Sequence, residues 1–154
     1  MTLTRCQLFR PTGLLTLDPP ARIDPAILPS HDGLEVRAYV HDLYRHLAAC
    51  DLAVVQGGLT TTMELTANLR PFVYFPLAHH FEQNFHGRHR LERYRAGRRM
   101  DFDKAPPEAI AEAITQEIGR TVDYLPIRTH GAARAAATIA ELLRKRPPRS
   151  SRST

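Results

Sequence analysis

The stretch that decides the fold is residues 50–65, CDLAVVQGGLTTTMEL. Its segment 51–55, DLAVV, is an almost continuous apolar run, as in a strand that is covered on both faces of a sheet. A helix is expected to follow over residues 60–69. Gly57 and Gly58 stand between the two, and glycine lets a backbone turn sharply and approach a ligand closely. The stretch predicts the strand, turn and helix of an α/β domain.

The same alternation continues along the chain. Strand-like runs are expected at 13–17, 34–39, 71–76 and 98–101, and helices at 41–48, 82–95, 106–118 and 129–145. Strands that alternate with helices are typical of an α/β domain built on a parallel sheet. We therefore predict a parallel sheet flanked by helices.

Length and composition indicate one ordinary globular domain. The chain has 154 residues, of which 43% are hydrophobic and 24% charged. No apolar run reaches the roughly 18 to 20 residues of a membrane helix, and Arg5, Arg10 and Pro11 interrupt the N-terminal segment before a signal peptide could form. Cys6 and Cys50 are far apart in sequence, which favours reduced thiols. We expect a cytoplasmic protein.

The net charge of +5 is concentrated in two segments. Residues 86–99 carry six arginines against Glu92, and most of these are expected on the wet face of a helix. The tail from 145 to 154 combines Pro, Ser and Arg and is predicted to be disordered. The alternative for these basic segments is a weak contact with phosphate or with the inner face of a membrane.

The diglycine corner has the composition of an anion site. Free N–H groups at a helix N-terminus attract phosphate, and the dipole of the helix adds to that attraction. The threonine hydroxyls at 60–62 are expected at the same helix N-terminus. Glu64 follows one turn later, where it could accept hydrogen bonds from both hydroxyls of a ribose. The alternative is a tight turn capped by threonines, with Glu64 as a solvated acid. Neither a P-loop nor a Gly-x-Gly-x-x-Gly fingerprint is present.

Residues 49–97 resemble the donor-binding C-terminal lobe of GT-B glycosyltransferases, especially the group of the bacterial lipid II GlcNAc transferase and the UDP-glycosyltransferases. The pattern is an Asp before an apolar strand, a Gly pair, a hydroxyl residue and a Glu, then two prolines around a strand, an acid–Gln pair and a Gly. The matching positions are Asp51, Gly57, Gly58, Thr61, Glu64, Pro71, Pro76, Glu82, Gln83 and Gly97. The resemblance implies a Rossmann-like sheet, a single GT-B lobe that is shortened at its N-terminal side.

The resemblance also implies roles for individual residues, with a UDP-linked hexose or GlcNAc as the donor. The diphosphate would lie on Gln56, Gly57, Gly58, Thr60, Thr61 and Thr62. The ribose would be held by Glu64, the base would meet Val40 with Leu43 nearby, and the donor sugar would face His80, Glu82, Gln83 and His86. Gln56 and His86 replace the His and the Asn that are frequent in the group.

Residues 1–33 are too few for a second lobe, so we expect a connecting segment with one strand, a donor-binding domain over 34–144, and the tail. Either a partner chain supplies the acceptor lobe, or the chain is a truncated enzyme. No residue is a convincing catalytic base. His79, His80, His86 and His89 could in principle bind zinc, but polar groups lining a sugar pocket or the surface are the preferred interpretation, and neither a cofactor nor a metal is expected.

Two other functions remain open. A basic module could bind nucleic acid through residues 86–99 and the tail, although no helix-turn-helix or stacking pattern supports it. A non-catalytic interaction protein could retain the fold and its pocket without using them. Binding of nucleotide sugars would distinguish both from a donor-binding subunit.

Overall fold

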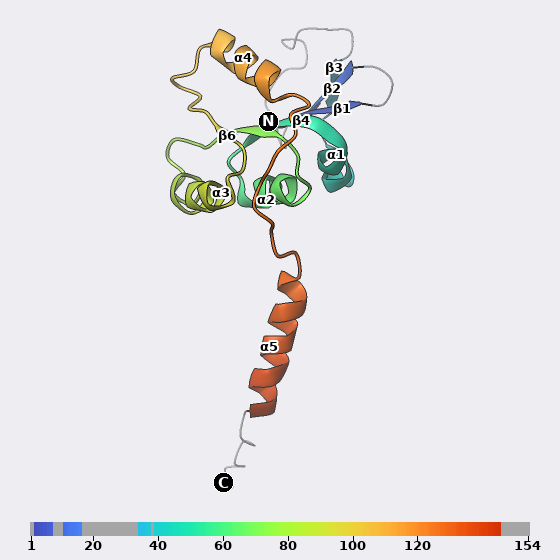
Figure 1. Ribbon diagram of the computed structural model, residues 1–154, viewed down its shortest axis with the longest axis vertical. Helices are drawn as coiled ribbons and strands as arrows, with labels where there is room; N and C mark the ends of the chain where they lie inside the picture. Colours follow the sequence, from blue (N-terminus) through green and yellow to red (C-terminus); the bar gives the residue numbers. More distant parts are fainter. Residues whose placement is uncertain (1, 8–10, 17–33, 38, 146–154) are drawn as a thin grey trace.

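A computed structural model describes residues 2–7, 11–16, 34–37 and 39–145. Within this part the chain forms a six-stranded sheet with helices on both faces (Figure 1). Its strands are β1 (Thr2–Gln7), β2 (Pro11–Thr16), β3 (Leu34–Arg37), β4 (Cys50–Gln56), β5 (Phe72–Phe75) and β6 (Arg98–Arg99). The expected connection at 17–33 and the tail at 146–154 lie outside the described residues.

The strands follow the order β3-β2-β1-β4-β5-β6. Strands β4, β5 and β6 are parallel neighbours, which confirms the expected parallel sheet for this half. Strand β1 runs antiparallel to both β2 and β4, so the expectation of a uniformly parallel sheet is wrong there. The order is that of a doubly wound sheet, but an antiparallel pair, β1 and β2, stands where such sheets have a strand–helix–strand unit.

The N-terminal segment thus contributes two strands to the sheet instead of the expected one. Strand β2 pairs in parallel with β3, which therefore points in the same direction as β4. The carboxyl ends of β3, β4, β5 and β6 consequently meet one edge of the sheet. In open α/β sheets this edge is the usual location of ligand sites.

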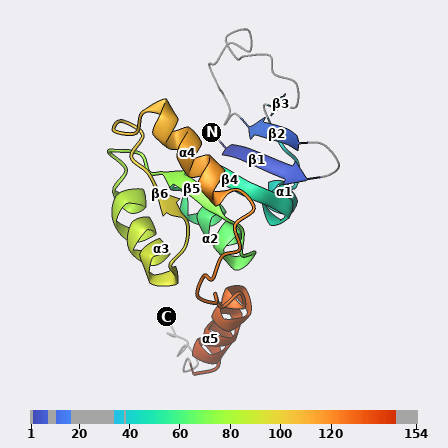
Figure 2. The ribbon, with the colours of Figure 1, turned by 45° about the horizontal axis from the view of Figure 1, so that its top comes forward.

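The helices form two layers around the sheet (Figures 1 and 2). On one face lie α1 (Leu43–Ala49), α2 (Leu59–Ala67) and the π-helix η2 (Glu82–Gly87), which continues into α3 (Arg88–Tyr94). Helix α4 (Pro107–Glu117) covers the other face. The α/β prediction is therefore confirmed, with helix positions close to those expected from the sequence.

Both faces of the central strands are buried, as the apolar run of β4 predicts. Towards α1, α2 and α3, the core contains Val55, Leu65, Phe72 and Leu91. On the α4 side, a smaller core is formed by Leu52, Val73 and Ala113, with Val54, Phe75, Met100, Ile114 and Ile118 packed against it. Successive residues of β4 and β5 thus pack alternately into the two cores, on opposite faces of the sheet.

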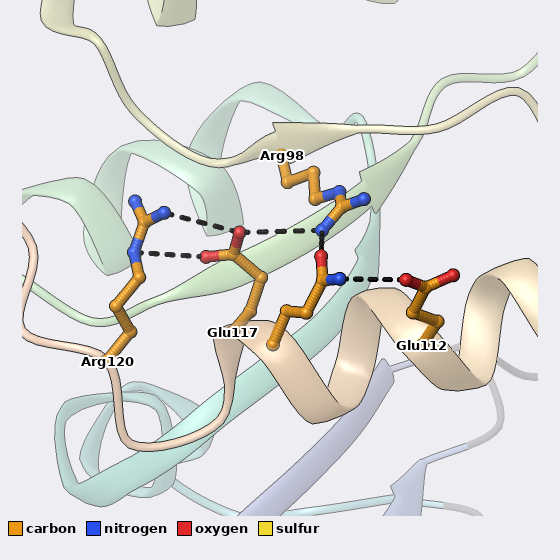
Figure 3. A network of polar contacts seen from close by, with 5 residues as sticks. Arg98, Glu112, Glu117 and Arg120 are labelled. Carbon is orange, nitrogen blue, oxygen red and sulfur yellow. Dashed lines mark hydrogen bonds and ion pairs between the residues drawn. The ribbon is translucent and has the colours of Figure 1, made fainter.

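A polar network ties β6 to the end of α4 (Figure 3). The Glu117 side chain is only 8% exposed and lies between two arginines, with Arg120 Nε at 3.3 Å and Arg98 at 3.9 Å. Arg98 also donates to Gln116 Oε1 at 2.6 Å, and Gln116 donates in turn to Glu112. Because β6 has only two residues, these side-chain contacts help to hold it at the edge of the sheet.

Helix α5 (Gly131–Lys145) differs from the others because it stands clear of the sheet and its helices (Figure 1). Each of its residues is exposed. Residues 126–130 connect it to a segment that is still anchored, since Leu125 N–H donates to Tyr94 O at 3.0 Å and Tyr124 is buried. Among the described residues, no helix is both long and apolar enough to cross a membrane.

Candidate functional site

The diglycine corner lies at the sheet edge where the parallel strands end. Strand β4 ends at Gln56, and α2 begins at Leu59 with Gly58 as its N-cap residue. The first N–H groups of a helix have no partner within the helix, and the positive end of its dipole lies there. Because β4 ends just before α2 begins, the N–H groups at the start of α2 lie at this edge of the sheet.

Gly57 is a packing glycine. Its N–H donates to Phe75 O at 3.3 Å, which joins the corner to the end of β5. A Cβ atom at Gly57 would lie 3.1 Å from Pro76 Cα and 3.4 Å from Gln83 Oε1. Gly87 approaches from η2, since a Cβ there would lie 3.5 Å from Gly57 O. A side chain at Gly57 would therefore require the neighbouring segments to move apart by a few tenths of an ångström.

Gly58 has the opposite surroundings. A Cβ atom at this residue would meet no other atom within 4 Å. Its backbone angles, φ −62° and ψ 129°, suit any residue, so local geometry does not require a glycine. The corner is closed at Gly57 and open at Gly58.

The three threonines do not share one role. Thr60 is exposed and Thr61 half-buried, and with Glu64 they occupy neighbouring positions on the outer face of α2. Thr62 is fully buried, and its hydroxyl lies within hydrogen-bond distance of the backbone oxygens of Gly58, at 2.9 Å, and Leu59, at 3.1 Å. The expectation that Thr62 offers a hydroxyl to a ligand at the helix N-terminus is therefore wrong. Its N–H is also engaged, by Gly58 O at 3.1 Å.

Gln83 is the residue of the expected sugar site that the structure brings to the corner. Its Oε1 accepts a hydrogen bond from Leu77 N–H at 2.9 Å, next to Gly57. An amide whose oxygen is held in this way keeps its NH₂ group to donate elsewhere. Gln83 thus links the loop after β5 to the corner.

Sequence reasoning missed Asn84. Its side-chain nitrogen lies within hydrogen-bond distance of the backbone oxygens of Leu77 at 2.6 Å, His80 at 3.1 Å and Ala78 at 3.3 Å. One side chain therefore fixes the course of the loop that follows β5. The sequence signal was weak, because an Asn inside a helical pattern is ordinarily a surface residue.

The other residues expected around the sugar lie on the surface of this loop and of η2. His80, Glu82 and His86 are all exposed. His86 packs edge-on against Phe81 and Phe85, whose rings stack with 5.4 Å between centroids. The histidine is thus part of an exposed aromatic group.

The residues expected near the base lie on the other side of α2. Val40 is buried in the connection between β3 and α1. Leu43 begins α1 and packs against the core on that face. Strand β3 is separated from β4 by β2 and β1, and helix α1, which begins at Leu43, packs beside α2.

Two hollows flank Asn84. One, of about 260 Å³, lies at the carboxyl ends of β5 and β6 and is lined by Pro76, Ala78, Asn84, Arg99, Asp101, Asp103 and Lys104. The other, of about 390 Å³, runs along η2 and α3 and is lined by Asn84, Phe85, Arg88, His89 and Glu92. Both hollows are lined by acidic as well as basic side chains.

Ion pairs lower the pKa of one acid in each hollow. A hydrogen bond with Lys104 lowers the pKa of Asp101, and a hydrogen bond from Arg88 lowers the pKa of Glu92. Burial raises the pKa of Tyr74 above its ordinary value of 10.0, although the nearby Arg99 opposes that shift. At neutral pH the two acids are therefore charged, and Tyr74 keeps its proton.

Among the described residues, no three His, Cys, Asp or Glu side chains come together as a metal site. The two cysteines are far apart in sequence, yet Cys6 and Cys50 are register partners in β1 and β4.

No protein-family model matches this sequence, and no curated protein matches it significantly. The assignment of a function thus depends on the geometry of the corner and on the residue pattern.

Proposed function

We propose that this domain binds a nucleotide-diphosphate sugar, with UDP as the nucleotide, as the donor-binding lobe of a GT-B-type glycosyltransferase. The observation that carries the proposal is the open Gly58 at the N-terminus of α2, at the carboxyl end of a parallel strand. Backbone donors, the helix dipole and unobstructed space for an anion coincide at that point. The diphosphate would lie against Gly58 and the N–H groups of Leu59, Thr60 and Thr61.

The positions of the neighbouring side chains support the same orientation of the ligand. Glu64 lies one turn further along the face of Thr60 and Thr61, where it can accept hydrogen bonds from ribose hydroxyls. Gln83 reaches the corner from the other side, so its NH₂ group would meet the sugar. Glu82, His80 and His86 would border the sugar from the surface. Val40 would contact the base through its backbone.

The chain's contribution to glycosyl transfer would be electrostatic. When the bond between the sugar and the diphosphate breaks, negative charge grows on the departing phosphate. Preorganised N–H groups at the head of α2 and the hydroxyls of Thr60 and Thr61 would stabilise that charge. A partner chain would supply the acceptor site and the group that takes the acceptor's proton. The reaction would take place in the cytoplasm, without a bound metal.

Calorimetric titration tests the proposal. The full chain should bind UDP more tightly than ADP or NADH. Glu64→Ala should weaken UDP binding by about 1 to 3 kcal/mol, the scale for losing the partner of a bound polar group. The matched control is Glu108→Ala, because Glu108 is an exposed first-turn acid of α4 on the opposite face of the sheet. Equal, weak binding of the three nucleotides would contradict the proposal.

A further inference from the structure

Helix α5 presents an apolar stripe that nothing in the described structure covers. Ile139, Leu142 and Leu143 are 57%, 64% and 63% exposed. The helix has 15 residues, a length at which isolated helices are marginally stable in water. A helix of this kind gains stability mainly by burying its apolar face against another surface.

The faces of α5 are sharply divided. With 100° between successive residues, one half of the helix is lined by Ala132, Ala135, Ala136, Ile139, Leu142 and Leu143. The opposite side carries Arg134, Thr138, Glu141 and Lys145. Strong division, low overall hydrophobicity and basic residues on the polar face are the features of helices that lie in the plane of a membrane interface.

The charges of this region favour an anionic surface. Helix α5 carries three basic residues, Arg134, Arg144 and Lys145, but a single acidic residue, Glu141. Glu141 forms an ion pair with Lys145 at 2.6 Å. Glu141 is also the last acidic residue of the sequence, and three more arginines follow within residues 146–154. Basic residues next to an amphipathic helix are attracted to anionic lipid headgroups.

A second copy of the chain fits this face less well. Stable protein interfaces bury about 1,200 Å² or more in total, whereas α5 offers large apolar side chains only at Ile139, Leu142 and Leu143. The positive charges would also repel each other across a symmetric helix pair. Nucleic acid would use the charges but leave the apolar stripe in water.

We propose that α5 lies on the surface of an anionic phospholipid bilayer, with its apolar stripe among the acyl chains and its basic residues at the headgroups. Residues 126–130, which join α5 to the anchored Leu125, form neither helix nor strand. Helix α5 leaves the body on the side of the sheet that carries α3 (Figures 1 and 2), where Arg90, Arg93 and Arg95 are exposed. The body would thus face the bilayer with a basic helix. This proposal does not depend on the nucleotide-sugar assignment.

Co-sedimentation of the full chain with vesicles tests the proposal. The protein should sediment with vesicles that contain phosphatidylglycerol and remain in solution with pure phosphatidylcholine. Binding should weaken as salt is raised, because the attraction to the headgroups is screened. The far-ultraviolet circular dichroism signal of helix should increase when anionic vesicles are added.

Matched variants separate the contribution of the stripe from that of the charges. Leu142→Gln combined with Leu143→Gln should weaken vesicle binding at least tenfold, whereas Ala137→Gln, on the polar side, should leave it within twofold. Replacing Arg134, Arg144 and Lys145 with Gln should abolish the preference for anionic lipid. Because α5 stands clear of the body, the thermal unfolding of the body should be unchanged in all variants, which excludes misfolding as a cause.

Three results would overturn the proposal. One is equal sedimentation with both kinds of vesicle, and another is unchanged binding by the double Leu variant. The third is a dimer in sedimentation velocity without vesicles that the same double variant abolishes, which would assign the stripe to a second copy of the chain.

Discussion

Gly97 lies so close to the ring of Phe72 that a Cβ atom on Gly97 would be 2.2 Å from Phe72 Cε2. Phe72 is a fully buried residue of β5 and packs edge-on against Tyr124, with 6.0 Å between ring centroids. The backbone of Gly97 also has φ +68°, in the left-handed region that favours glycine. The chain therefore passes from α3 into β6 over the face of a buried ring.

We expect Gly97→Ala to lower the free energy of unfolding by about 2 to 5 kcal/mol. About 1 to 2 kcal/mol comes from the left-handed backbone, and about 1 to 3 kcal/mol comes from displacing Phe72 in a packed core. Urea denaturation would measure the change.

Gly119→Ala is the matched control for Gly97→Ala. Gly119 has φ +70° but no atom within 4 Å of an added Cβ. Its substitution should cost only the backbone part of the penalty. If the two variants were equally destabilised, Phe72 would not determine the requirement for glycine at position 97.

Glu117 is expected to stabilise the junction of β6 and α4. Glu117→Gln should reduce the free energy of unfolding by about 1 to 2 kcal/mol, because an amide cannot pair with both arginines. The effect is limited by solvent, since the side chains of Arg98 and Arg120 are 38% and 51% exposed. Glu112→Gln, at an exposed position of the same network, should change stability by less than about 0.5 kcal/mol. A similar loss in both variants would show that burial of Glu117 is unimportant.

The sequence predicted the central part of the fold because local and tertiary preferences agree there. The apolar run of β4 is long enough to be covered on both faces, and prolines bound β5, so both strands could be recognised. The antiparallel β1 could not, because TLTRCQ is short and mixed in character and its direction depends on its pairing with β4. Alternation of strands and helices predicts parallel neighbours only where a helix makes the crossover.

The residue types of the candidate site could be predicted from the sequence. Which of these residues would be buried and which would be open to a ligand could not. Thr60, Thr61 and Thr62 are chemically alike, and the phase of α2 alone turns Thr62 inward, next to Leu65 and Thr66. The two glycines are also equivalent in sequence. Only the approach of Pro76 and Gly87, from segments distant in sequence, makes Gly57 a packing residue and leaves Gly58 open.

The two glycines of the corner should respond differently to alanine, and this contrast separates ligand binding from packing. Gly58→Ala should change the free energy of unfolding by less than about 0.5 kcal/mol, because a weaker N-cap is offset by the lower entropy of the unfolded chain. Gly57→Ala should cost about 1 to 3 kcal/mol, because its Cβ would press on the backbone of Pro76.

The affinity for UDP should show the opposite contrast. Relative to its effect on the free energy of unfolding, Gly58→Ala should weaken UDP binding more than Gly57→Ala does. In Gly58→Ala a methyl group occupies the open side of the corner, so the affinity for UDP should fall about tenfold, or about 1.4 kcal/mol, while the protein stays folded. Calorimetry on this folded variant gives the decisive measurement. If Gly58→Ala bound UDP as tightly as the unaltered chain, the phosphates could not lie against Gly58, and the diphosphate site would have to be sought elsewhere along the sheet edge.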